Sequence, residues 1–169
     1  MNFAILSTEN HPIISYFLFE LYKSRIKNFI VIFDEKKTSL KDCSIVNKRT
    51  KNFFKKKKNN LWIILKKFNI SHFYVKNHNS HDCEKLIKRK KLDLLINSGS
   101  PRKINKNILK STNVGILNVH PGMLPKYKGQ TCVEWSIYNN DKVGNTLHLM
   151  DEKYDSGPIV KTETYQFSK

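Results

Sequence analysis

Several features that define other protein classes are missing from this chain of 169 residues. The longest apolar runs, at residues 29–33 and 61–65, are far shorter than the ~20 residues that a membrane-spanning helix needs. No basic segment precedes the apolar start, so we expect no secretory signal peptide. The three cysteines are odd in number and lack metal-type spacing, which argues against a disulfide framework. We therefore expect a soluble, cytoplasmic protein with a single domain over residues 1–169.

Glycine is also scarce, with 6 residues in the whole chain. None of them lies in residues 7–11, which follow the first apolar segment. A dinucleotide-binding fingerprint and a P-loop both need glycines at that point, because the backbone must approach a phosphate closely. The sequence therefore excludes both of these nucleotide-binding motifs.

Acidic residues are few, and the 14 Asp and Glu against 31 Lys and Arg give a net charge of +17. Such a charge suits nucleic acid, an anionic membrane surface or an anionic substrate. Arginine, however, which reads bases and grips phosphates, occurs only at Arg25, Arg49, Arg89 and Arg102. Lysine, asparagine, isoleucine and phenylalanine all have AT-rich codons, so a compositional bias of the genome explains much of the excess charge.

Short apolar segments alternate with amphipathic ones along the chain. Apolar runs predict strands at residues 2–7, 29–33, 70–75, 92–97 and 114–119. Helical spacing predicts helices at residues 12–24, 61–68, 80–91 and about 104–111. Two further strands are predicted at residues 144–151 and after residue 157, whereas residues 35–60 have no clear pattern.

This alternation predicts an α/β fold, Rossmann-like, with a mostly parallel sheet and helices on both faces. Ligands of such sheets bind beyond the carboxyl ends of the strands. Asn118 and His120 lie at such an end and, being two residues apart, project from the same face of an extended backbone. A carboxamide and an imidazole so placed can together stabilise negative charge on one carbonyl oxygen, as acyl transfer requires.

Three separated pieces of sequence strengthen this interpretation. They are Asn118-Val-His120-Pro-Gly-Met-Leu-Pro125, then Gly129, then Asp155-Ser-Gly157-Pro158. In order and spacing they resemble the folate-dependent formyltransferase family, which includes glycinamide ribonucleotide, methionyl-tRNA and amino-sugar N-formyltransferases. The resemblance is strongest over residues 92–160.

The resemblance implies the formyltransferase fold and transfer of a formyl group from N10-formyltetrahydrofolate to an amine. It makes Asn118, His120 and Asp155 the catalytic residues, with Asn118 and His120 on the oxyanion. Asp155 would hold the imidazole, favour its charged form and help to remove the proton of the attacking amine. It further implies that formyl-folate is bound by two segments, which contain Gly99, Arg102 and Ile104, and Asp151 and Glu152.

The acceptor amine implied by the resemblance is that of an anionic small molecule, a nucleotide-linked amino sugar. Glycinamide ribonucleotide fits poorly because residues 7–11 lack the glycine-rich loop. The tRNA enzyme carries a second domain, and we expect this chain to be a catalytic domain shortened at its C-terminus. Two alternatives remain: a catalytic domain like that of methionyl-tRNA formyltransferase, and a lysine-rich RNA-binding protein without catalysis.

Two other segments invite a functional interpretation. His78, His81 and Cys83 are close in sequence, but no second cluster completes a metal site, and we expect a solvated helix start. Residues 48–58 combine lysines with Phe53 and Phe54 and form the best candidate for contact with nucleic acid. The favoured alternative is an amphipathic helix with both phenylalanines packed inward.

Overall fold

The computed structural model describes residues 1–56 and 60–166 of the chain. Within these residues, no helix has both the length and the apolar composition to cross a membrane.

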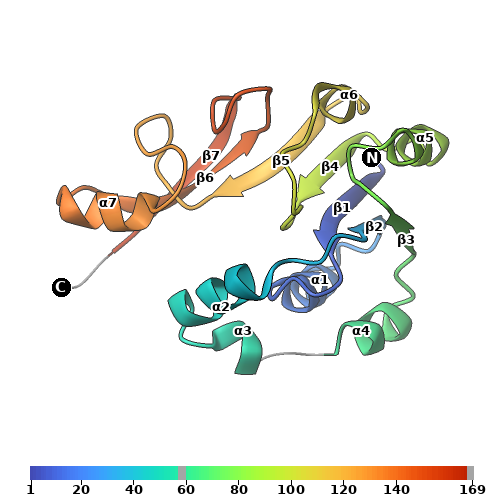
Figure 1. The fold of residues 1–169 in the computed structure, drawn as a ribbon, viewed down its shortest axis with the longest axis horizontal. Helices are drawn as coiled ribbons and strands as arrows, with labels where there is room; N and C mark the ends of the chain where they lie inside the picture. Colours follow the sequence, from blue (N-terminus) through green and yellow to red (C-terminus); the bar gives the residue numbers. More distant parts are fainter. Residues whose placement is uncertain (57–59, 167–169) are drawn as a thin grey trace.

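The described residues form one sheet of seven strands (Figure 1). Its order is β3-β2-β1-β4-β5-β6-β7, in which β1 to β5 pair in parallel and the pairs β5–β6 and β6–β7 are antiparallel. The strands are β1 (Phe3–Thr8), β2 (Phe29–Asp34), β3 (His72–Val75), β4 (Leu94–Asn97), β5 (Gly115–His120), β6 (Val143–Leu149) and β7 (Ile159–Tyr165). The predicted α/β architecture is confirmed.

Helices connect most of the strands. They are α1 (Ile14–Lys23), α2 (Leu40–Arg49), α3 (Phe53–Lys56), α4 (Leu61–Lys67), α5 (His81–Arg89), α6 (Lys106–Leu109) and α7 (Cys132–Tyr138). Four of them begin with a polar side chain that accepts a hydrogen bond from the first turn. These N-caps are Ser39, Asn60, Ser80 and Asn105, and each satisfies a backbone N–H that would otherwise lack a partner.

Alternating strand residues build a separate core on each face of the sheet. Ala4 and Leu6 of β1 pack with Ile87 of α5 and Ile108 of α6, whereas Ile5 packs with Leu18 of α1 on the other face. Figure 1 shows α5 and α6 on one side of the sheet and α1 and α4 on the other. Both faces of the parallel strands are therefore covered, which explains their continuous apolar sequences.

Residues 35–60, in which the sequence shows no clear pattern of helix or strand, contain α2 and α3. Helix α2 has no buried residue and α3 is only four residues long, so neither carries the apolar stripe that predicts a helix. Helix α7 was also not predicted. It exposes Trp135 and Tyr138 and buries Cys132 and Ser136, so its sequence has no continuous apolar face.

Candidate functional site

Strand order changes direction between β1 and β4, the place where sheets of this kind bind ligands. A pocket of about 320 Å³ lies at the carboxyl ends of the neighbouring strands β4 and β5. Its walls come from the ends of these strands, from the segment after β4, and from the loop between β6 and β7. The lining residues are Asn97, Ser100–Ile104, Asn118, His148, Met150, Asp151 and Lys153–Asp155.

Asn118 lies near the end of β5 and lines this pocket. Its side-chain Oδ1 accepts a hydrogen bond of 3.0 Å from Nδ2 of Asn97, the last residue of β4. Its Nδ2 lies 3.2 Å from Nε2 of His148. One N–H of the Asn118 amide is thus directed at His148, which leaves the second for a bound oxygen.

His120 ends β5 and is 4% exposed. Its Nδ1 lies 3.5 Å from Oδ1 of Asp155, while its Nε2 donates a 2.8 Å hydrogen bond to the carbonyl of Tyr127. The sulfur of Cys132 also lies 3.2 Å from Nε2. The Tyr127 bond determines the ring orientation, because a carbonyl oxygen can only accept, and so Nδ1 must face the carboxylate.

Asp155 belongs to the loop between β6 and β7 and has a positive φ of 49°. Its Oδ2 accepts a hydrogen bond of 2.9 Å from the backbone N–H of Gly129, and its Oδ1 lies 3.8 Å from Nε2 of His148. The carboxylate therefore lies between two imidazoles at the pocket wall. The structure brings Asn118, His120 and Asp155 together, as their shared place in the motif predicts.

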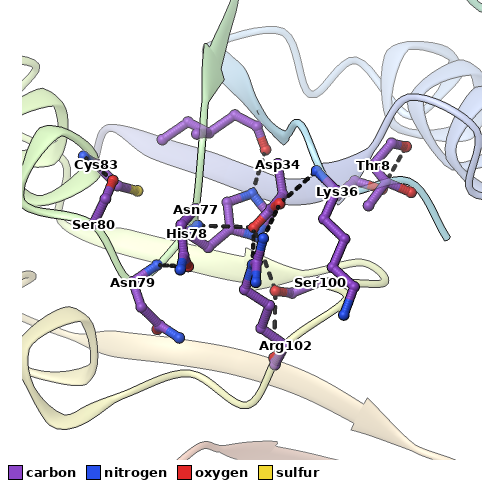
Figure 2. A network of polar contacts seen from close by, with 12 residues as sticks. Thr8, Asp34, Lys36, Asn77, His78, Asn79, Ser80, Cys83, Ser100 and Arg102 are labelled. Carbon is purple, nitrogen blue, oxygen red and sulfur yellow. Dashed lines mark hydrogen bonds and ion pairs between the residues drawn. The ribbon is translucent and has the colours of Figure 1, made fainter.

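The segment after β4 forms another wall and is held by a buried ionic network (Figure 2). Asp34, at the end of β2, accepts hydrogen bonds from Arg102 at Nε (2.8 Å) and Nη2 (3.2 Å). It also accepts bonds from the backbone N–H groups of Lys36 and His78. Burial alone would raise the pKa of the Asp34 carboxyl, but these hydrogen bonds outweigh it and lower that pKa.

His78 completes this network. Its Nε2 lies 3.0 Å from the carbonyl of Ile32, and its Nδ1 lies 2.9 Å from the hydroxyl of Ser100. Burial lowers the pKa of His78 and outweighs the opposing effects of the Ile32 carbonyl and of Asp34. The predicted helix start is present, with Ser80 as its cap, but the prediction that it is solvated is wrong for His78 and Cys83, which are completely buried. Within residues 1–56 and 60–166, no group of three His, Cys, Asp or Glu residues is arranged to hold a metal ion.

The residues expected to bind formyl-folate differ in their surroundings. Arg102, Ile104 and Asp151 line the pocket, although the guanidinium of Arg102 is engaged by Asp34 and Asp151 accepts bonds from its own loop. Gly99 lies against the ring of His11, and Glu152 forms an exposed ion pair with Lys106; neither lines the pocket.

The structure describes residues 48–56 of the segment 48–58, and there the chain forms the end of α2 and the separate short helix α3. Lys51 and Asn52 have positive φ angles between α2 and α3, so the expected continuous amphipathic helix is wrong for this stretch. Phe53 and Phe54 pack edge-on against Tyr16 of α1, and Phe53 is 40% exposed. Lys57 and Lys58, which belong to the same predicted segment, lie outside the described residues.

Sequence reasoning did not single out Asp34 or Asn97. A usable signal exists, because Asp34 and Asn97 are each the polar residue that closes an apolar strand. In a parallel sheet these closing residues all lie at the ligand-binding edge.

The family model described as "Formyl transferase" matches residues 1–167. A methionyl-tRNA formyltransferase of Trichodesmium erythraeum (strain IMS101) is 34% identical over 76 residues, which are 44% of this chain and 23% of that protein. The matched segment thus spans less than a quarter of that relative.

Solved structures show the same fold. A phosphoribosylglycinamide formyltransferase from Bacillus Halodurans has a TM-score of 0.67 at 18% identity, with coverage of 100% of this chain and 81% of that chain. A sugar N-formyltransferase from Shewanella sp FDAARGOS_354 has a TM-score of 0.62 at 22% identity, with coverage of 99% and 58%. Because the family model matches nearly the whole chain, this protein belongs to the formyl transferase family.

Proposed function

We propose that this protein transfers a formyl group from N10-formyltetrahydrofolate to a primary amine. One observation carries the proposal: a carboxamide, an imidazole and a carboxylate converge beside a pocket of about 320 Å³ at the ligand-binding edge of the sheet. Family membership supports the same reaction.

The pocket has the chemistry that a pterin ring requires. Ile104 and Met150 offer apolar surfaces, and Ser100 and Asp151 are polar residues of its lining. Pro101 removes one N–H donor from this wall. When bound, N10-formyltetrahydrofolate supplies a formyl group carried on nitrogen.

The protein's own groups then have distinct tasks. The free N–H of Asn118 would donate to the formyl oxygen, on which negative charge develops during attack. The carboxylate of Asp155 would accept the proton that the attacking amine must lose, and would deliver it to N10 as the bond between the formyl carbon and N10 breaks. His120, which the resemblance places on the oxyanion with Asn118, has its Nε2 on the Tyr127 carbonyl instead. With its Nδ1 3.5 Å from Asp155, it would hold this carboxylate and share the proton.

For the acceptor, we propose the amine of a nucleotide-linked amino sugar. A second cavity, of about 290 Å³, shares Ser100 and Pro101 with the first. The rest of its lining includes the two cations Lys36 and Lys37 and one carboxylate, that of Asp42. Two lysines beside the formyl-folate pocket suit the phosphates of such a molecule. The amine would then lie between the two cavities, within reach of the transferred group.

Methionyl-tRNA is a second candidate acceptor, which the similarity to the tRNA enzyme over 76 residues favours. An acceptor of that kind would contact many phosphates, so its binding would weaken steeply with salt. A small nucleotide-linked sugar would show a much shallower dependence.

A direct assay tests the reaction. Purified protein is incubated with N10-formyltetrahydrofolate and a panel of nucleotide-linked amino sugars, glycinamide ribonucleotide and charged initiator tRNA. We expect release of tetrahydrofolate and a formylated amino sugar by mass spectrometry, with loss of both in Asn118→Ala. If no amine is formylated, the proposed function is wrong; if only the tRNA is formylated, the amino-sugar assignment is wrong.

A further inference from the structure

Three polar side chains lie side by side across the strands that border the formyl-folate pocket. Asn97 of β4 is the register partner of Asn118 of β5, and Asn118 is the register partner of His148 of β6. Register partners on neighbouring strands point to the same face and are close enough to contact one another. Hydrogen bonds join all three, from Asn97 Nδ2 to Asn118 Oδ1 and between Asn118 Nδ2 and His148 Nε2.

Backbone groups determine the direction of this chain at both ends. At one end, the backbone N–H of Ser100, which can only donate, bonds to Oδ1 of Asn97 at 3.0 Å. At the other end, the carbonyl of Leu149, which can only accept, lies 3.0 Å from Nδ1 of His148. An amide or an imidazole in between has no freedom to turn over without losing a bond.

The protons can therefore be assigned in sequence. Because Oδ1 of Asn97 accepts from Ser100, its Nδ2 donates to Asn118, and the Asn118 amide must present its oxygen to β4 and its nitrogen to β6. His148 then accepts at Nε2 and carries its proton on Nδ1. The Asp155 carboxylate, 3.8 Å from Nε2, is too distant to form a hydrogen bond there.

We propose that Asn97 is a positioning residue, which orients the Asn118 amide so that an N–H rather than the oxygen faces the transferred formyl group. The inference rests on the proposed function, since Asn118 acts on that group there. If the amide turned over, its oxygen would face a developing oxyanion and repel it. Asn97 also binds the wall residue Ser100, so one side chain connects the pocket wall with the reacting region.

The Asn97→Asp variant tests this directly. A carboxylate still accepts from Ser100 but cannot donate to Asn118. We expect the Asn118 amide to turn over so that its nitrogen faces the carboxylate, which moves the His148 proton to Nε2 and gives up the hydrogen bond to the Leu149 carbonyl. We expect kcat to fall by about tenfold or more, while the KM for formyl-folate changes little because the Ser100 bond is kept. Asn145→Asp is the matched control: Asn145 lies on β6, donates to the hydroxyl of Tyr165, and does not line the pocket.

A spectroscopic measurement separates orientation from the added charge. Nitrogen-15 chemical shifts of the neutral imidazole, recorded at about pH 8, report which ring nitrogen carries the proton. His148 is assigned by the signal that His148→Gln removes. We expect the Nδ1–H form in the wild type and in Asn145→Asp, and the Nε2–H form in Asn97→Asp.

Each outcome is decisive. An Nε2–H form in the wild type would overturn the proposal even if Asn97→Asp fails to fold. In a folded Asn97→Asp, either an unchanged kcat or an unchanged His148 tautomer would also overturn it. If the tautomer changes as expected but no amine is formylated by the wild type, the orientation of Asn118 is supported and the proposed function alone is wrong.

Discussion

Nδ1 of His120 lies 3.5 Å from Oδ1 of Asp155, and the two side chains are only 5% and 14% exposed. One residue ends β5 and the other follows β6, so the pair exists only because these strands are neighbours in the sheet. Shielding from water strengthens the interaction between an imidazole and a carboxylate, and makes the loss of either group costly.

Replacing Asp155 with asparagine should lower kcat by ~10²-fold or more, because the amide cannot accept a proton from the attacking amine. The measurement is steady-state formyl transfer, with circular dichroism to verify folding. Asp82→Asn, in the first turn of α5, serves as the control and should retain full activity. Turnover close to that of the wild type would remove Asp155 from the mechanism.

His120→Ala should cause a similar loss, and the double variant with Asp155→Asn should be scarcely worse than either single change. Residues that act as one unit have strongly non-additive effects. A double-mutant cycle on kcat measures this. Independent, additive losses would show that the 3.5 Å contact has no part in catalysis.

Arg102→Leu should reduce the free energy of unfolding by about 3–5 kcal/mol, because it leaves the buried carboxylate of Asp34 without its charged partner. Urea denaturation measures the change. Lys103→Met, which removes an exposed contact with the ring of Tyr154, should cost less than about 1 kcal/mol. Equal costs for the two variants would contradict a structural role for the Asp34–Arg102 pair.

The free energy of unfolding should fall as the pH drops below 6.5. This is the ordinary pKa of histidine, and burial lowers the pKa values of His11 and His78 below it. Between the lowered values and 6.5 the unfolded chain binds more protons than the folded one, so the free energy of unfolding rises with pH there. Each such group contributes up to about 1.4 kcal/mol per pH unit.

His78→Gln tests the origin of this dependence, because glutamine can still donate to Ile32 and accept from Ser100 but does not titrate. Urea denaturation between about pH 5 and 7 should show a smaller slope for the variant. An unchanged slope would mean that His78 is not neutral and buried in solution. The lowered pKa of Asp34 acts in a separate window, since its contribution is lost only as the pH falls below 3.8 through the folded value.

Gly157→Ala should destabilise the protein by about 1–3 kcal/mol, since the added Cβ would lie 1.9 Å from the carbonyl oxygen of Leu149. It should also lower kcat, because the displaced loop carries Asp155. Gly144→Ala meets the carbonyl of Glu163 at 2.2 Å and is the matched control, as residue 144 does not line the pocket. Equal activity losses at equal stability would show that the Gly157 contact does not position the site.

The sequence alone determines the order of the strands and of helices α1, α4, α5 and α6, and the motif around Asn118. Both are local: an apolar run predicts a buried strand, and a spacing of two residues puts Asn118 and His120 on one face. The carboxyl-end rule even indicates the edge of the sheet at which the pocket lies. The resemblance to the formyltransferase family comes from the same short motif.

Only the tertiary structure decides which side chains meet. Arg102 binds Asp34 across 68 residues, and Asn97, Asn118 and His148 align through the register of three strands. Strand order and register are set by the packing of both cores and not by any local pattern. For that reason the guanidinium of Arg102 binds Asp34, although the family resemblance implied that Arg102 contacts folate. Asn97, which belongs to no motif, is hydrogen-bonded to Asn118.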